Sequence, residues 1–454
     1  MEHEIKALVN RYQGGGYLEI HLETREFTTI EYSGSELETL TRSELFVGNI
    51  RLFEKGFWYF TSFMDRDFDK HYDRILKMLL VGEAREGTIN SYQKINTQIK
   101  TPFQIDSRLI PLEEKYSLIK KYNEIILNSK NIQTSRVIYK DIARKKYFAN
   151  SEGSYIEQEK LFTGVSCAAV ARSGMNIQTA SYSHAGHGGY ELVTGKEAEV
   201  EKTVSQALEM LNAPQVEGGR YNVILDNQMS GVFAHEAFGH LSEADFIYEN
   251  PEMQDMMKLG REFGREIVNI VDDGTIEGLA GYVPFDDEGV NGRRTELIKS
   301  GKLNARLHSR ETAIKMGETV TGNARALNPF FAPQVRMTNT FIDNGITPVS
   351  ELFEACGNGI YACGFIGGMT SLEQFTFTPR CAYIVKNGKI VSPVRDTVLS
   401  GNVFETIKNI THTGNDLKHF GTLGGCGKGG QNGLTVTTGG PHILVENVLV
   451  GGKK

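Results

Sequence analysis

The sequence contains few cysteines and no long apolar run, and each absence excludes a class of protein. The 454 residues include five cysteines, an odd number without the regular spacing of a disulfide framework. Scattered thiols of this kind are typical of a reducing compartment. No apolar stretch approaches the roughly 18 residues that cross a bilayer, and the first residues lack the basic and apolar segments of a secretory signal. We therefore expect a cytoplasmic protein that does not enter a membrane.

The sequence also contains fewer basic than acidic residues. Lysine and arginine number 49 against 56 acidic residues, which gives a net charge of −7. A chain of this balance is not expected to bind nucleic acid as its main activity. The hydrophobic share of 40% is ordinary for a globular protein, and the length predicts two domains with room for real cores.

The spacing of apolar residues predicts an α+β fold. Leu112 to Leu127 and Glu197 to Asn212 have the period of amphipathic helices. The segments between them alternate as strands do and are short enough for hairpins. These predicted strands are Ser135 to Lys140, Lys146 to Ala149, Ser154 to Lys160 and Gly164 to Ala171. We place an N-terminal α+β domain at residues 1–214 and a β-rich catalytic domain at residues 215–454.

One short segment has the residue types of a metal hydrolase. After a predicted strand at Tyr221 to Asp226, the chain reads His235-Glu236-Ala237-Phe238-Gly239-His240. Imidazoles bind divalent cations, and a neighbouring carboxylate can accept a proton from the attacking water. In the familiar H-E-x-x-H motif the histidines are four apart, whereas a spacing of five separates them by roughly 140° on a regular α-helix. Either a π-bulge or a helix end at His240 must bring them together, and Gly239 is the residue that permits either distortion.

A catalytic metal also needs a third protein ligand and an open position. Cys426 is the best candidate, because its glycine-rich surroundings let a thiolate approach the helix closely. The same segment does not match the phosphate-binding motif G-x-x-x-x-G-K-[S/T], because Gly429 occupies the position of the required serine or threonine hydroxyl. His235, His240 and Cys426 are therefore the predicted ligands of one Zn²⁺, although imidazole and thiolate also suit iron. Glu236 is the predicted general base.

Five further residues have chemistry that the sequence leaves open. Glu243 and Asp245 follow His240 closely, so that one of them orients an imidazole or both are exposed helix acids. His184 and His187 are either ligands or, as we favour, part of a glycine-rich loop that touches the active site or a partner. His308 could stabilise an oxyanion together with nearby arginines, but a surface position is favoured.

These motifs together resemble the TldD/PmbA family of metallopeptidases. The H-E-x-x-x-H segment and Gly425 to Gln431 resemble the two ligand motifs of that family, and five other segments resemble it outside them. They are Phe148 to Gly153, His187 to Gly189, Phe285 to Gly289, Thr321 to Arg325 and Pro333 to Thr340. The run after His240 departs from the more usual glycine-leucine-glutamate-glycine-aspartate, which leaves the surroundings of the ligands less certain than the ligands.

The resemblance implies a two-domain subunit that dimerises around an enclosed cavity. In this family a TldD-type subunit carries the metal and a PmbA/TldE-type subunit lacks it, so this chain resembles the metal-bearing type, as a homodimer or beside a metal-less relative. The implied activity is hydrolysis of flexible or unfolded peptides. Two other readings stay open: a metal-stabilised regulatory or binding subunit without hydrolysis, and a redox protein. A peptide-cleavage assay with and without a chelator distinguishes the regulatory subunit from a peptidase. Metal analysis of freshly purified protein distinguishes the redox protein.

Overall fold

The structure, a computed structural model, describes residues 1–79, 87–371 and 373–452. It is a mixed, strand-rich fold, which confirms the α+β prediction. Within the described residues, no helix has both the length and the apolar composition that a membrane span requires.

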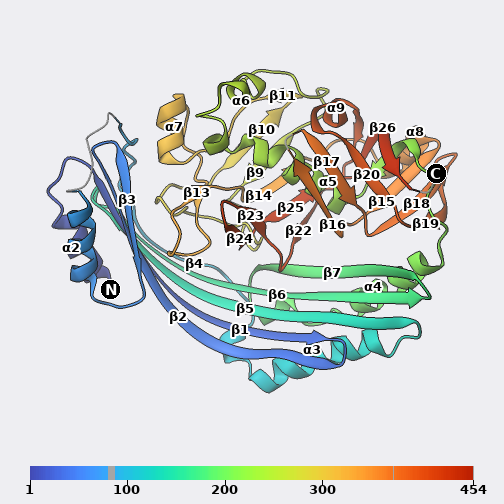
Figure 1. The fold of residues 1–454 in the computed structure, drawn as a ribbon, viewed down its shortest axis with the longest axis horizontal. Helices are drawn as coiled ribbons and strands as arrows, with labels where there is room; N and C mark the ends of the chain where they lie inside the picture. The colour runs from blue at the N-terminus through green and yellow to red at the C-terminus, as the bar shows by residue number, and fades with distance from the viewer. Residues whose placement is uncertain (80–86, 372, 453–454) are drawn as a thin grey trace.

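A long, curved sheet forms the first half of the chain (Figure 1). Its order is β3-β2-β1-β5-β6-β4, with β7 also paired to β6. The strands are β1 (Tyr17–Ser33), β2 (Glu36–Glu54), β3 (Phe57–Phe63), β4 (Asn96–Lys100), β5 (Ile132–Asn150), β6 (Tyr155–Ser173) and β7 (Asn176–His187). The helices of this half are α1 (Glu2–Asn10), α2 (Phe68–Met78), α3 (Leu112–Leu127) and α4 (Glu197–Asn212), with 3₁₀ turns η1 (Ser107–Leu109) and η2 (Tyr190–Leu192).

The two long helices have the bounds that the sequence predicts, but the strands are longer than predicted. Each pair of predicted segments is one continuous strand, β5 or β6, and their antiparallel register runs on through the polar residues between them. Those polar residues find partners elsewhere in the fold. Asp141, in the middle of β5, is buried and forms an ion pair of 2.6 Å with Lys115 of α3. Polar positions inside a long two-sided sheet therefore concealed the continuity of the strands.

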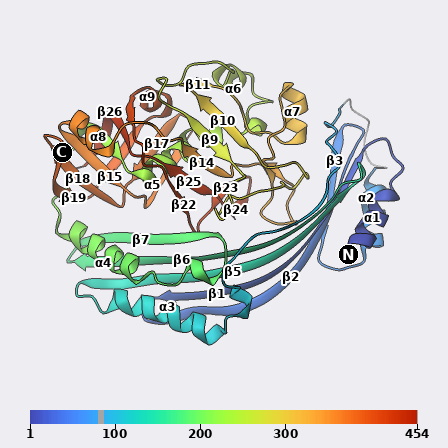
Figure 2. The same cartoon turned by 180° about the vertical axis from the view of Figure 1, so that it is seen from behind.

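The two faces of this sheet have different neighbours. Helices α3 and α4 pack on one face, where Ile119, Tyr122 and Val200 join Val137 and Val165 in an apolar core. The second half of the chain lies on the opposite, concave face, as both views show (Figures 1 and 2). The concave face meets the second half through polar contacts, such as Arg25 to the Leu327 carbonyl and Lys146 to Asp287, and through a small apolar cluster in which Phe162 and Ala185 pack with Ala280.

The second half contains two larger sheets. One has the order β16-β17-β20-β26-β8-β15-β18-β19, with β21 paired to β26, and the other has the order β11-β10-β9-β14-β25-β22. Each sheet draws its strands from one side of the predicted boundary at residues 214/215, and that boundary stays a prediction. The strands of the first sheet are β8 (Gly219–Leu225), β15 (Gly359–Cys363), β16 (Gly367–Ser371), β17 (Gln374–Thr378), β18 (Cys381–Lys386), β19 (Lys389–Val394), β20 (Val398–Asn402), β21 (Ile410–Thr413) and β26 (Ile443–Gly451). Those of the second are β9 (Ile270–Asp273), β10 (Arg294–Lys299), β11 (Lys302–Leu303), β14 (Asn339–Ile342), β22 (Lys418–Gly421) and β25 (Thr437–Gly440).

A short buried helix lies between these sheets and carries the predicted site. It is α5 (Asn227–Ala234), whose Met229 and Phe233 join the large apolar core of this half. Gly231 lies so close to β25 that a Cβ would be 2.4 Å from the backbone nitrogen of Gly439, so only glycine fits there. The remaining elements are α6 (Pro251–Met256), α7 (Arg310–Met316), α8 (Val349–Cys356), α9 (Val403–Lys408), β12 (Ala324–Arg325), β13 (Gln334–Val335), β23 (Cys426–Lys428) and β24 (Gln431–Leu434).

Candidate metal centre

The chain after α5 changes its helical period at the predicted motif. Asp226 caps the helix by accepting a hydrogen bond from the Met229 N–H at 2.8 Å. His235–Gly239 then form a π-helical turn (η3), and His240–Ser242 form a 3₁₀ turn (η4). The wider π turn brings residues five apart onto one face, so the rings of His235 and His240 lie with centroids 5.2 Å apart. The predicted π distortion is confirmed.

Gly239 has a different role from the one predicted. Its φ of −57° is ordinary for a helix, so the turn does not depend on the conformational freedom of glycine. A Cβ at this position would lie 2.0 Å from the sulfur of Met337, which is fully buried. Glycine is required at position 239 because the segment that precedes β14 packs against the turn. The backbone of the turn itself is not strained.

We expect Gly239→Ala to destabilise the protein by about 1–3 kcal/mol, since the added methyl must displace a packed methionine. Denaturant unfolding measures this free energy. Gly15→Ala is the matched control, because nothing lies within 4 Å of a Cβ built there. Equal stability of the two variants would contradict the packing argument.

Cys426 reaches the two histidines from the distant C-terminal region of the chain. It opens the β23–β24 hairpin, and its Sγ lies 3.3 Å from Nε2 of His240. Candidate ligand atoms of His235, His240 and Cys426 all lie within 4.8 Å of one another. The structure therefore brings together the three residues that the sequence singles out.

The donor set fits a metal ion of the zinc type. Zn–N bonds of about 2.0 Å and Zn–S bonds of about 2.3 Å at a tetrahedral centre place the two donors roughly 3.5 Å apart, close to the observed separation. Nδ1 of His235 is buried and has no hydrogen-bond partner among the described residues, a cost that a ligand would remove. Two imidazole nitrogens and one thiolate leave a fourth position, as in catalytic zinc sites.

Electrostatics favour a thiolate at Cys426. Burial raises the pKa of the thiol, but hydrogen bonds and charge from His235 and His240 outweigh it and lower the pKa to about 5. Burial lowers the pKa of His240, but Cys426 and Glu243 outweigh it and raise the pKa to about 10. Between these values the metal-free pair is a thiolate beside an imidazolium, and a bound cation would take the place of the proton on His240. The thiolate is the form that binds metal.

A network of buried charges connects the histidine turn to the cysteine hairpin. Glu243 is fully buried, and its Oε2 lies 3.1 Å from Nδ1 of His240 and 3.0 Å from Nζ of Lys428. Lys428 also donates to Asp245 at 2.5 Å and to the Val335 carbonyl at 2.8 Å. Glu243 thus orients His240 with Nε2 toward Cys426, which agrees with the first alternative for these two acids. The exposed-acid alternative is wrong for both.

Replacing Glu243 with glutamine keeps the shape of the side chain and removes its charge from His240 and Lys428. We expect the affinity for zinc to fall by about 10- to 100-fold, the usual effect of losing a carboxylate that orients a ligand imidazole. Competition with a chromophoric chelator measures the affinity. Glu252→Gln, at an exposed site on α6, is the control. An unchanged affinity in Glu243→Gln would show that His240 needs no such partner.

Two buried arginines, which the sequence analysis assigned no role, hold the cysteine hairpin in place. Arg336 is fully buried and donates to the carbonyl of Cys426 at 2.7 Å. Arg325 donates to the carbonyls of Thr435, at 2.8 Å, and Met337. Both arginines lie in segments that stand out in the sequence only for their resemblance to the family. Nothing in the spacing of these residues indicates a buried arginine. Their contacts are to backbone carbonyls, which no side-chain pattern records.

Glu236 faces a cleft beside the three ligands. The cleft has a volume of about 610 Å³, and Glu236 and His240 form part of its wall. The Glu236 side chain is half-buried, and no described residue is hydrogen-bonded to its carboxylate. The remaining wall residues are Leu241, Phe246, Asn250, Met253, Gly368, Met369, Thr370, Gly427, Lys428 and Gly429. A carboxylate on this wall is available to a molecule in the cleft.

The other histidines lie outside this grouping. His187 ends β7, where its N–H donates to Gly278 at 2.9 Å, and the neighbouring Ser183 accepts from Leu423 at 3.0 Å. His184 and His187 both belong to strand β7, so the predicted glycine-rich loop is wrong at these positions, although the strand does contact the segment leading to Cys426. His308 is 1% exposed and bound to Glu318 at 3.0 Å, so the expected surface position is wrong.

Comparison with known proteins gives consistent results over most of the chain. Residues 105–211 match the PmbA/TldA metallopeptidase central domain, and residues 218–452 match its C-terminal domain. A protein named metalloprotease from Synechocystis sp. is 40% identical, over 99% of this chain and 97% of its own length. The zinc metalloprotease TldD homolog of Saccharolobus solfataricus is 33% identical, over 82% of this chain and 77% of its own.

Two solved structures share the fold. TldE from Thermococcus kodakarensis superposes with a TM-score of 0.75 and 17% identity, covering 99% of both chains. A protein from Thermotoga maritima described as a proposed modulator of a DNA gyrase gives a TM-score of 0.79 and 22% identity, also over 99% of both chains. At these identities the likeness concerns the fold alone.

Proposed function

Because the chain belongs to the PmbA/TldD family of metallopeptidases, we propose that it is a metal-dependent peptidase. One observation carries the proposal: His235, His240 and Cys426 converge within 4.8 Å at the side of an open cleft, with Glu236 on its wall. A structural metal site would be closed by four protein ligands, whereas three ligands beside a cleft suit a reaction.

Each residue of the centre has a separate task in this proposal. His235, His240 and Cys426 would hold the cation, most suitably Zn²⁺, and Glu243 would fix the tautomer of His240. When bound, such a cation supplies an acidified water and polarises the scissile carbonyl. Glu236 accepts the proton of the attacking water and returns it to the leaving amine. Lys428 keeps Glu243 charged and ties the cysteine hairpin to the histidine turn.

The cleft fits an extended chain as its substrate. One wall consists of Gly368, Met369 and Thr370 of β16, which among the described strands pairs only with β17 and is the outer strand of its sheet. An outer strand offers unpaired backbone groups to an extended peptide, independently of side-chain identity. This favours flexible or unfolded peptides over folded proteins. The proposal includes a dimer, with a second copy or with a metal-less TldE-type relative, in keeping with the family.

The proposal is tested by digesting a denatured peptide mixture with the purified protein and sequencing the new ends by mass spectrometry. We expect cleavage that a chelator abolishes and that added zinc restores. Intact peptides in the presence of stoichiometric metal would instead support a metal-stabilised regulatory or binding subunit.

A further inference from the structure

A second cluster of charged side chains lies between the long sheet and the loops of the second half. Arg25 of β1 is directly opposite Arg144 of β5, and Arg144 is directly opposite Lys160 of β6. Three cations thus form a row across three adjacent strands. Like charges opposite one another in a ladder destabilise it, so such a row requires compensating negative charge.

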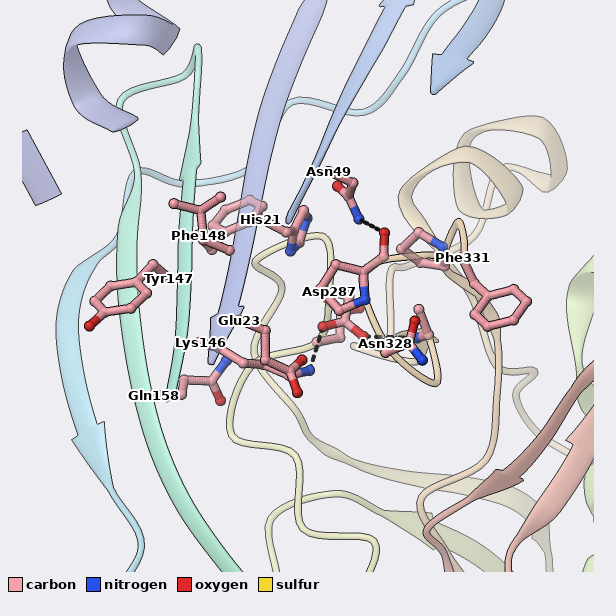
Figure 3. Close-up of a pocket in the computed structure, with 15 residues that line it drawn as sticks. His21, Glu23, Asn49, Lys146, Tyr147, Phe148, Gln158, Asp287, Asn328 and Phe331 are labelled. Carbon is pink, nitrogen blue, oxygen red and sulfur yellow. Dashed lines mark hydrogen bonds and ion pairs between the residues drawn. The ribbon is translucent and has the colours of Figure 1, made fainter. Parts of the chain in front are cut away.

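The described carboxylates compensate only one end of this row. Glu23 pairs closely with Arg25, and its Oε1 is 3.9 Å from Nε of Arg144, beyond hydrogen-bond distance. Asp287 also lines the cavity, but its carboxylate is already bound to Lys146 at 2.8 Å and accepts from the Ala326 N–H, and Figure 3 shows the Lys146 pair from the adjoining pocket. Among the residues that the structure describes, no carboxylate lies within 4.0 Å of Lys160. Its Nζ donates to the Tyr282 carbonyl at 3.2 Å and lies 5.5 Å from the centre of the Tyr282 ring.

The second half of the chain adds another cation, and the sheet itself adds buried nitrogens without hydrogen-bond partners among the described residues. Arg325, only 6% exposed, binds backbone carbonyls and has no carboxylate partner in the described chain. Nε of Arg144 and Nδ1 of His187, a residue 8% exposed, are buried and have no hydrogen-bond partner in the part of the chain that the structure describes. Burial, with Lys146 and Arg325 nearby, holds the pKa of Lys160 well below its usual range. Each observation reflects the cost of leaving these cations without a counter-charge.

The space among these groups is small. The cavity lined by Arg144, Lys160, His187 and Arg325 has a volume of about 40 Å³. That is room for roughly three waters, which excludes a nucleotide or a peptide and admits a small ion. Asp286 also lines it, but its carboxylate accepts from the N–H groups of Glu288, Val290 and Ala324 and so faces its own loop.

We propose that this cavity binds a small oxyanion of the phosphate, sulfate or carboxylate class, which accepts hydrogen bonds from Arg144, Lys160 and His187. The anion neutralises the cation row and connects the concave face of the sheet to strand β12, which carries Arg325. Since Arg325 also holds the Thr435 carbonyl behind the cysteine hairpin, the bound anion stabilises the contact between the two halves of the chain. The proposal does not depend on the metal centre or on hydrolysis.

Thermal unfolding of the full-length, metal-loaded protein tests this inference. Phosphate, sulfate and acetate are titrated separately at an ionic strength held constant with sodium chloride. We expect phosphate to raise the unfolding midpoint saturably, by about 3 °C at 100 times its dissociation constant. The order of the three anions distinguishes a tetrahedral ligand from a carboxylate. Equal midpoints in all salts would mean simple screening and would overturn the proposal.

Two variants locate the effect. Lys160→Met should remove the response to phosphate while raising the midpoint in phosphate-free buffer, because it deletes an uncompensated charge. Lys145→Met is the control and should keep the response. Lys145 follows Arg144 in β5, and on the other face of the sheet it pairs with Glu157 at 2.7 Å. Arg144→Met replaces Lys160→Met if the latter does not fold. A response that survives in Lys160→Met would place the anion elsewhere, the metal centre included, and contradict the assignment.

Discussion

Glu236→Gln is expected to retain its metal and to lose peptide hydrolysis by about 10²- to 10⁴-fold, the usual contribution of a general base. Glutamine has nearly the same shape as glutamate but cannot accept the proton of the attacking water. The side chain lies on the wall of the cleft and no described residue is bound to it, so the substitution disturbs no packing or ion pair. Turnover of a quenched peptide and metal content are measured on the same preparation.

The outcome separates a peptidase from the regulatory or binding subunit that the sequence also leaves open. Cleavage at the parental rate by Glu236→Gln would remove the general-base assignment while leaving the metal site intact. Wild-type protein that holds stoichiometric metal and cleaves nothing would favour the regulatory or binding subunit. Glu252→Gln, which changes an exposed acid of α6, is expected to behave as wild type in both measurements.

Cys426→Ala is expected to yield protein with well under one metal ion per chain and without activity. The thiolate is the one anionic ligand of the predicted set, and its lowered pKa makes it available at neutral pH. Without it, His235 and His240 remain as two neutral donors, too few for a stable zinc site. Elemental analysis of freshly purified protein gives the metal content directly.

Cys363→Ala is the matched control for this loss. Cys363 is also buried, at 9% exposure, but burial raises the pKa of its thiol well above the usual range, so it stays protonated. We expect full metal content and activity from this variant. Full metal content in Cys426→Ala as well would show that the histidines find their third ligand elsewhere.

The residues of the centre were predictable because metal chemistry restricts residue types. His235, Glu236, His240 and Cys426 form a combination with few other uses, and their spacing already required a distorted helix. The π turn at His235–Gly239 confirms that requirement. Helices α3 and α4 were equally predictable from the sequence, because their apolar residues recur regularly and pack on one face of the sheet.

The residues around the centre could not be predicted, because their partners are distant in sequence. Lys428 reaches Glu243 across more than 180 positions, and Arg336 binds a backbone oxygen of the cysteine hairpin. Such contacts exist only once the fold has formed. The strands were underestimated for a related reason: Asp141 and Arg144 interrupt the apolar pattern, and their surroundings, Lys115 and the second half of the chain, are distant in sequence.

The central claim is that one cation is held jointly by the histidine turn and the cysteine hairpin. Anomalous diffraction from crystals of the metal-loaded protein, collected on both sides of the zinc absorption edge, tests it most directly. We predict a single strong peak about 2.0 Å from a nitrogen of His235 and of His240 and about 2.3 Å from the sulfur of Cys426. A peak beyond bonding distance of that sulfur, or no peak between the two imidazoles in fully loaded protein, would contradict the account.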